Sequence, residues 1–359
     1  MIGPVKLIAY TENIAETVDV FRINHHLYAD DTQLQVHMRI DTIQANRLNL
    51  ELCIDAIKDW CASRRLQLNG YKTEIIWFDS RANLKKLFSV DTTLRIGSTI
   101  VEPVNSVRNM GVYMDSALSM RTHIGKVSAA CFYHLRRLRQ LRYVMSKSTM
   151  QRIVSSLVLA RIDYCNSILA RLTAVTLAPL NRVMNAAARL VAGLDVRDHV
   201  TLVMRELHLL PVTFRVQYKL CLMVHSSVNG CSPEYITAVL VPMSSLQGRA
   251  TLRSSTSGSF DVPRTRTCFG ERAFSVAGPA AWNKLPPNLR PSIDNYRFKR
   301  ALKAQFSVSL IAINLETFHA KRHRTNVLGL CMGRSKSYIA IAIAIGRECA
   351  GVERSWFVG

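Results

Sequence analysis

The stretch Leu27-Tyr28-Ala29-Asp30-Asp31-Thr32-Gln33-Leu34-Gln35 places two adjacent carboxylates between two partly apolar runs. Adjacent carboxylates repel each other and lose hydration when they are packed against a core, so such a pair most simply prepares a cation site. Hard divalent cations such as Mg2+ take oxygen ligands and need only one or two carboxylates plus a substrate phosphate. The alternation that continues through Val36 and Met38 predicts a β-hairpin with Ala-Asp-Asp at its tip. The alternative is an ordinary surface turn, which aspartates also favour.

The charge balance of the whole chain is strongly basic. Its 359 residues contain 47 Lys and Arg against 25 Asp and Glu, which gives a formal net charge of +22 and a pI near 10.0. This excess indicates a polyanionic partner, nucleic acid before membrane. A hydrophobic content of 48% favours a globular protein over a disordered one, and the length allows two or three domains.

Cysteine usage and apolar runs exclude several protein classes. The nine cysteines include no CxxC pair, so we interpret them as reduced thiols of an intracellular protein. Residues 1–10 lack the basic start and long apolar run of a signal peptide, and Ile339–Ile345 is too short to span a bilayer. His319 and His323 have a metal-like spacing but no second ligand pair, which argues against zinc.

Residues 1–115 are predicted to be α+β. A capping-box pattern at Asp41–Gln44 and apolar residues at helical spacing predict an amphipathic helix that continues to about Arg65. Strands are expected at Lys72–Phe78, Thr93–Val101 and Val107–Met114.

From Ser116 the sequence becomes helical and basic, and residues 116–195 form a second predicted domain. Between Ser116 and Ile162 there is no acidic residue, whereas nine residues are basic: Arg121, Lys126, Arg136, Arg137, Arg139, Arg142, Lys147, Arg152 and Arg161. A first helix is expected around Ile124–Leu141, a second capped at Ser148 with Ile153, Leu157 and Tyr164 inward, and a third over Leu177–Val191. Without acidic partners these charges repel one another unless a polyanion neutralises them. We favour contact with a phosphate backbone over the alternative, a solvated basic face.

The remaining chain divides into a third region, residues 196–308, and an unassigned tail, residues 309–359. The third region is expected to hold further helices, a compact segment anchored by Trp282, and a last basic helix that buries Phe298, Leu302 and Phe306.

Several motifs together resemble one protein family. Tyr-Ala-Asp-Asp followed by Thr-Gln-Leu is similar to the catalytic hairpin of reverse transcriptases of non-LTR (LINE-type, jockey-like) retrotransposons. Further blocks similar to that family are Leu68–Glu74, Val107–Asp115, Asp163–Asn166, Leu207–Pro211 and Phe274–Arg290. The resemblance covers roughly residues 5–308. It implies part of a polymerase palm over residues 1–115, a helical thumb over residues 116–195, and a family-like C-terminal region.

The resemblance also implies an activity, that of an RNA-directed DNA polymerase, which transfers nucleotides to a primer 3′-hydroxyl by a two-metal mechanism. Asp30 and Asp31 would ligate Mg2+ or Mn2+, Lys72 would lie near the nucleotide phosphates, and Tyr28 would border the primer terminus. Contacts to nucleic acid are expected from Gly111, within the segment similar to a primer grip, and from the predicted thumb. The thumb residues are Arg121, Lys126, Arg136, Arg137, Arg139 and Arg142. The implied partners are an RNA template, a DNA primer and dNTP, with no membrane, in a nuclear or cytoplasmic ribonucleoprotein.

One departure from the family concerns the third carboxylate, which the family carries on an earlier palm strand. Only 29 residues precede Asp30, and their acids are Glu12, Glu16 and Asp19, which we interpret as solvated charges. We therefore expect an N-terminally truncated reverse transcriptase with an incomplete active site that does not polymerise alone. The alternatives are a non-catalytic RNA- or DNA-binding remnant that uses the basic thumb, and a pseudogene product.

Overall fold

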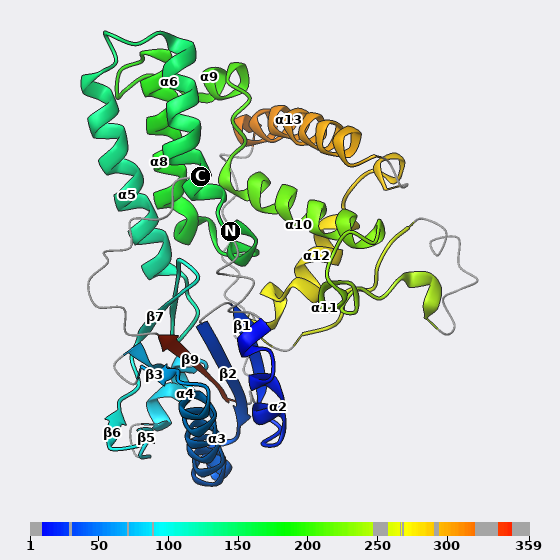
Figure 1. Ribbon diagram of the computed structural model, residues 1–359. Helices are drawn as coiled ribbons and strands as arrows, with labels where there is room; N and C mark the ends of the chain where they lie inside the picture. The colour runs from blue at the N-terminus through cyan, green and yellow to red at the C-terminus, as the bar shows by residue number, and fades with distance from the viewer. Residues whose placement is uncertain are drawn as a thin grey trace. The chain divides into compact units, whose positions relative to one another are not determined.

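The computed structural model describes residues 9–28, 31–69, 72–87, 90–246, 258–265, 267, 269–290, 294–319 and 337–346. At residues 40, 308–319 and 337–346 it describes the backbone alone. The predicted α+β class is confirmed (Figure 1). The chain divides into two compact units, residues 1–122 together with 334–359, and residues 123–333. The predicted boundary between residues 115 and 116 thus lies a few residues before that between the two units.

The first unit is organised around an antiparallel sheet that joins both ends of the sequence. Its strands are β1 (Asn24–Tyr28), β2 (Asp31–Met38), β3 (Gln67–Leu68), β4 (Glu74–Phe78) and β9 (Ser337–Gly346). Strand β9 pairs with β2 on one side and with β3 and β4 on the other, so a segment of the tail forms the centre of the sheet. In Figure 1 it is the dark red arrow among the blue strands.

Helices and two small hairpins complete this unit. The helices are α2 (Ile14–Asp19), the 3-10 turn η1 (Ile40–Thr42), α3 (Ile43–Ser63) and α4 (Arg81–Lys86). The hairpins are β5 (Leu94–Ile96) with β6 (Thr99–Val101), and β7 (Ser106–Asn109) with β8 (Val112–Asp115). The helix and strands predicted between residues 41 and 115 are therefore confirmed, with each of the two later strands of the prediction resolved as a hairpin.

The two faces of the sheet differ because side chains alternate along a strand. On one face, Leu34 and Met38 of β2 are buried in a core with apolar residues of α3, such as Ile54. On the opposite face of β4, Ile76 and Phe78 pack against Val107 and neighbouring residues of the β7–β8 hairpin. The opposite face of β2 carries the polar residues Asp31, Gln33, Gln35 and His37, none of which is buried.

The second unit is helical in its described part. Its elements are α5 (Arg121–Gln140, whose first two residues belong to the first unit), α6 (Lys147–Val154), the π-helical turn η4 (Ser155–Leu159), α7 (Ala160–Asp163), η5 (Asn166–Leu169), α8 (Ala174–Ala192), α9 (Thr201–Glu206), α10 (Val212–Val228), α11 (Glu234–Thr237), η6 (Met243–Ser245), η8 (Gly270–Arg272), α12 (Phe274–Trp282), η9 (Pro287–Leu289) and α13 (Asn295–His319). Helix α6 contacts α8, and α10 contacts α8, α12 and α13.

An aromatic cluster forms one core of the second unit. Trp282 is 1% exposed and donates a hydrogen bond from Nε1 to the carbonyl of Gly258 at 2.9 Å. The buried ring of His225 stacks on Phe298 with 3.9 Å between the ring centroids. The predicted anchoring role of Trp282 and the burial of Phe298, Leu302 and Phe306 are confirmed.

The predicted inward face of the second basic helix is wrong in part. The N-cap of α6 is Ser146, whose hydroxyl accepts a hydrogen bond from the backbone N–H of Thr149, and not Ser148. Leu157 and Tyr164 are exposed. The buried residues recur instead at every fourth position: Met150, Val154, Val158 and Ile162. The wide turn η4 explains this, because a π-helical turn takes more residues than an α-helical one and so shifts the buried face.

Candidate nucleic-acid interface

The hairpin that carries the two carboxylates has the predicted register. Strands β1 and β2 pair antiparallel, with Tyr28 opposite Asp31 and Leu27 opposite Thr32. Ala29 and Asp30 lie outside the described residues, so the predicted metal ligand Asp30 cannot be placed. Asp31 and Tyr28 are both exposed at the turn end of this ladder. The pair therefore lies at the edge of the polar face of the sheet.

The strand next to β2 brings no acidic partner to Asp31. Ala344 of β9 is its register partner, and the sequence of β9 contains no Asp or Glu. Two residues further along β2, Gln33 pairs with Ala342 of β9, and Ala342 pairs in turn with Glu74 of β4. The Cα atoms of Asp31 and Glu74 are then about 12 Å apart, from a strand spacing of about 4.8 Å and a rise of about 3.4 Å per residue.

This donor set does not fit the two-metal site that the resemblance implies. Within the described residues, no three side chains of His, Cys, Asp or Glu lie together as a metal site requires. Two-metal catalysis needs carboxylates that bridge ions about 3.5–4 Å apart. The described part of the chain supplies Asp31 alone at this position, and we derive no catalytic step through a metal.

The turn between β7 and β8 lies beside the polar face of β2. Met110 and Gly111 both have positive φ, 47° and 78°, as a two-residue type I′ hairpin turn requires. The side-chain amide of Gln33 donates a hydrogen bond to Oδ1 of Asn109 at 2.8 Å. This bond joins the segment that is similar to a primer grip to the strand that begins at Asp31. Gly111 therefore serves the turn through its backbone.

Lys72 is exposed and lies outside the strands. Its backbone N–H donates to the carbonyl of Asn69 at 3.1 Å, and Gly70 and Tyr71 between them lie outside the described residues. Lys72 precedes β4 by two residues, and β9 separates β4 from β2. Lys72 and Asp31 are therefore not neighbours within the sheet.

The basic residues of α5 gather on the side of the helix that is not packed. Lys126, Tyr133, Arg136 and Arg137 share one face of the helix by its periodicity, and all are exposed. The opposite face buries Ile124, Cys131, Leu135 and Leu138. Arg139 is exposed at the flank, and Arg121 is exposed at the first position of α5. The described residues include no acidic side chain that forms an ion pair with any of these cations.

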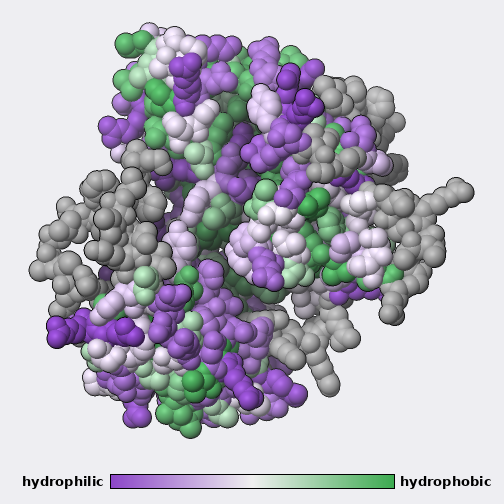
Figure 2. Space-filling view, turned by 45° about the vertical axis from the view of Figure 1, so that its right-hand side comes forward, coloured by the Kyte–Doolittle hydropathy of each residue, from purple (hydrophilic) through white to green (hydrophobic). Residues whose placement is uncertain are grey.

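The local potential is positive enough to affect a neighbouring histidine. Partial burial is the main cause that lowers the pKa of His134, and the charges of Arg161 and Arg137 lower it further. A positive field that disfavours a protonated imidazole favours an anion at the same surface. In Figure 2, hydrophilic residues cover much of the visible surface of the helical unit.

Arg142 differs from the other cations because it is packed. It is half-buried, and its guanidinium lies so close to Gly193 that a Cβ there would displace it. Gly193 ends α8 with φ of 80°, and a cation at the C-terminus of a helix is stabilised by the partial negative charge of the free carbonyls. Arg142 thus anchors the α5–α6 turn to α8.

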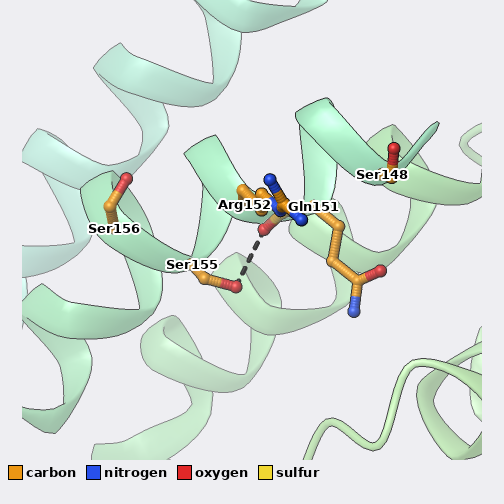
Figure 3. Close-up of a pocket in the computed structure, with 5 residues that line it drawn as sticks. All are labelled: Ser148, Gln151, Arg152, Ser155 and Ser156. Carbon is orange, nitrogen blue, oxygen red and sulfur yellow. Dashed lines mark hydrogen bonds between the residues drawn. The ribbon is translucent and has the colours of Figure 1, made fainter. Parts of the chain in front are cut away.

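A shallow, open hollow of about 640 Å³ lies along α6 and η4, and the residues that line it are of polar types (Figure 3). Its lining consists of Ser148, Gln151, Arg152, Ser155 and Ser156. The hydroxyl of Ser155 donates to the carbonyl of Gln151 at 2.8 Å, and that of Ser156 donates to the carbonyl of Ile153 at 3.1 Å. Hydroxyl, amide and guanidinium groups are those that contact phosphate and sugar in nucleic-acid complexes. The hollow therefore extends the basic surface along α6.

Exposed aromatic residues accompany these cations, and sequence reasoning missed them. Tyr143 is 92% exposed and Val144 is 86% exposed in the turn after α5, and Tyr133 is 49% exposed on α5. The guanidinium carbon of Arg137 lies 5.8 Å from the centroid of the Tyr133 ring, and Arg142 lies 5.7 Å from that of Tyr143. The Arg-Tyr pairing at spacings of four and one is visible in the sequence, but the exposure of the rings is not.

Two of the blocks that resemble the reverse-transcriptase family meet through an arginine. Arg215 is 13% exposed, and it donates from Nη1 to Oδ2 of Asp163 at 2.6 Å and from Nε to the carbonyl of Leu210 at 2.8 Å. Asp163 belongs to the block Asp163–Asn166 and Leu210 to the block Leu207–Pro211. In this chain these blocks hold α7 and the segment before α10 together.

Comparisons of the chain with protein-family models, with curated proteins and with solved structures found no match. The reverse-transcriptase resemblance therefore stays a prediction based on the motifs quoted above. Of the helices that the structure describes, none combines the length and apolar character needed to cross a bilayer.

Proposed function

We propose that this chain is a reverse-transcriptase-like protein that binds the phosphate backbone of RNA or DNA through α5 and α6, and that does not extend a primer by itself. The observation that carries the binding is the row of exposed cations on α5, with no acidic residue between Ser116 and Ile162. The nine cations of this stretch have no acidic residue among them, and a polyanion relieves their mutual repulsion. An RNA template paired with a DNA primer is the partner that the motif resemblance favours.

The partial palm and the thumb are part of this proposal. Support for the palm comes from the antiparallel Tyr-Ala-Asp-Asp hairpin and from the bond between Gln33 and Asn109, which joins it to the segment similar to a primer grip. Support for the thumb comes from the helical, basic character of α5 to α8. The proposed lack of unaided polymerisation follows from the acid-free strand β9 beside Asp31.

Salt dependence tests the binding. Affinity for a labelled 20-mer, measured by fluorescence anisotropy, should fall about 10³-fold or more between 50 and 200 mM salt if six or more phosphates are contacted. The triple variant Arg136→Gln, Arg137→Gln, Arg139→Gln should bind more weakly, and its slope of log K against log salt should be shallower by about 2–3.

A charge-matched variant provides the control. Lys299→Gln, Arg300→Gln, Lys303→Gln removes three exposed cations from α13 of the same unit. If this variant loses as much affinity as the α5 variant, the net charge of the chain drives binding and the assignment to α5 is wrong. Affinity that is insensitive to salt would contradict phosphate contact altogether.

Primer extension on an RNA template with Mg2+ or Mn2+ and dNTP tests the second part of the proposal. We expect no product above the background of a chain with Asp30→Ala and Asp31→Ala. Extension by the unaltered chain that the double variant abolishes would show a complete polymerase site and overturn the claim of incapacity.

A further inference from the structure

The turn between α5 and α6 presents an aromatic residue to solvent at the end of the basic surface. Tyr143 is 92% exposed and Val144 next to it is 86% exposed, within a turn of six residues, 141–146. Covering exposed apolar surface with a partner is favourable, so these two residues add an apolar contact to the end of the cationic surface.

The exposed ring of Tyr143 has a cation beside it. Arg142 lies 5.7 Å from the centroid of this ring and is itself packed against Gly193 at the end of α8. Tyr133 is supported in the same way: its hydroxyl accepts a hydrogen bond from Arg137 at 2.9 Å, and the guanidinium lies 5.8 Å from the ring centroid. The hydrogen bond restricts the ring of Tyr133, which therefore loses less conformational entropy when a flat partner stacks on it.

We propose that this turn is a stacking platform for unpaired nucleobases, so that the chain binds single-stranded nucleic acid in preference to a continuous duplex. Bases in a duplex are stacked on one another and offer no face to a protruding tyrosine. In a single strand each base has a free face, and proteins that bind single strands combine a cationic track with aromatic residues. Here Arg136 and Arg137 supply the cations between Tyr133 and Tyr143.

The hollow beside the turn continues the proposed binding surface along α6. It begins at Ser148, five residues after Tyr143, and its lining includes the guanidinium of Arg152. The guanidinium can donate to phosphate, and hydroxyl oxygens that donate within the helix can still accept from a sugar hydroxyl; neither contact reads base identity. The platform is therefore expected to tolerate any sequence. The inference rests on the proposed nucleic-acid binding and adds to it the class of nucleic acid.

The test compares Tyr143→Ala with Tyr143→Trp on a labelled 20-nucleotide strand and on the same strand paired with its complement. Tyr143→Ala should lower affinity for the single strand about 5- to 100-fold. It should leave both the duplex affinity and the salt slope unchanged. Tyr143→Trp should retain single-strand affinity, because indole also stacks. Tyr296→Ala, which removes a tyrosine that is 73% exposed on α13, is the matched control and should have no effect.

A stacking signal separates the platform from simple contact. A strand that contains 2-aminopurine should be quenched by the unaltered chain and by Tyr143→Trp, and quenched less by Tyr143→Ala. Equal losses of affinity for single strand and duplex, or no loss in Tyr143→Ala, would overturn the inference while the salt-dependent binding of α5 stands. If the α5 variant loses binding but the affinity of the unaltered chain does not depend on salt, the result would instead count against the proposed function.

A membrane surface is the competing occupant of an apolar tip flanked by cations. Co-sedimentation with vesicles of 70% phosphatidylcholine and 30% phosphatidylserine tests it. Vesicle binding that Tyr143→Ala and Val144→Ser abolish, together with an unchanged affinity for the single strand, would assign the turn to a lipid surface and overturn the stacking platform.

Discussion

Each unit is stabilised by its own contacts, and the two units differ in how far apart in the sequence the contacting segments lie. In the first unit, the centre of the sheet is a strand from the far end of the sequence, without which β2 and β4 have no common neighbour. In the second unit, α5 to α13 follow one another, and the arginine contacts that close it span shorter separations: Arg215 bonds to Asp163, 52 residues earlier, and Arg290 bonds to the carbonyls of Asn283 and Leu285. We therefore expect the first unit to unfold cooperatively when β9 is disrupted. The second unit should lose stability in smaller steps when single contacts are removed.

The largest expected effect comes from breaking β9. Ile341→Pro removes a ladder hydrogen-bond donor from the central strand and leaves a facing carbonyl unpaired, which alone should cost the first unit about 1–3 kcal/mol of its free energy of unfolding, before any clash of the ring. Hydrogen exchange should show lost amide protection in β2 and β4, while α8 and α10 keep theirs. Ala350→Pro, four residues beyond β9, is the control. Equal loss of protection in both units would show that they unfold together.

Cysteine labelling tests the same difference between the two units through the reactivity of their buried thiols. Burial raises the pKa of Cys53 to about 12 and that of Cys61 to about 11 in the first unit. Burial also raises the pKa of Cys221 to about 12 in the second unit. Because the thiolate is the reactive form, all three should resist maleimide at pH 8. In Ile341→Pro, Cys53 and Cys61 should react and Cys221 should not, whereas the exposed Cys231 should react in every variant.

A smaller effect is expected from the arginine clamp of the second unit. Asp163→Ala leaves the largely buried Arg215 without its carboxylate, which should cost about 1.5–3 kcal/mol of unfolding free energy. The control is Glu271→Ala, which removes a carboxylate from the more exposed pair with Arg171 and should cost less than about 1 kcal/mol. Urea unfolding monitored in the second unit measures both. Equal losses of unfolding free energy in the two variants would show that the burial of Arg215 does not strengthen its ion pair.

Two glycines of the second unit separate backbone strain from packing. Gly193 and Gly230 both have positive φ, 80° and 67°, but a Cβ at Gly193 meets Arg142 whereas one at Gly230 meets nothing. Gly230→Ala should cost about 1 kcal/mol, and Gly193→Ala about 1–2 kcal/mol. The altered position of Arg142 should also weaken single-strand binding in Gly193→Ala alone. Identical melting temperatures and affinities in the two variants would show that Arg142 moves away freely.

The smallest effect is acid sensitivity in the first unit. A hydrogen bond from Arg47, and then bonds from Thr93, lower the pKa of Asp91 from 3.8 to about 2. Because the folded-state pKa is depressed, this stabilisation is present above about pH 4 and is lost as pH falls towards 2. Asp91→Asn should flatten that part of the stability profile. An NMR titration of the Asp91 carboxyl with a midpoint near 3.8 would contradict the expectation.

The local parts of the fold could be predicted from the sequence. The alternation of Leu34, Val36 and Met38 indicated β2 and its buried face, and helical spacing indicated α3 and α5. These patterns suffice because each reflects a single buried face of one element. The candidate cations could likewise be named from the absence of acids, although the packing of Arg142 on Gly193 could not.

The non-local parts could not be predicted. Strand β9 alternates Ile with Ala, so the two faces differ only in size, and no neighbouring segment in the sequence marks it as the partner of β2. The π-helical turn η4 shifts the buried face that follows α6, and no residue type in Ser155–Leu159 predicts such a turn. The exposure of Tyr143 is a property of the packed helices, since a tyrosine of a core and one of a surface look alike in a sequence.

Because β9 lies far along the sequence from β2, the sheet of the first unit is completed late during synthesis. About 300 residues separate the end of β2 from the start of β9, so at about 5–20 residues per second a ribosome needs roughly 15–60 s to make the missing strand. During that interval the edges of β2 and β4 that face each other are open templates for any extended chain nearby. Protection of these edges during synthesis, by a chaperone or by the nascent chain itself, is therefore a requirement of this topology.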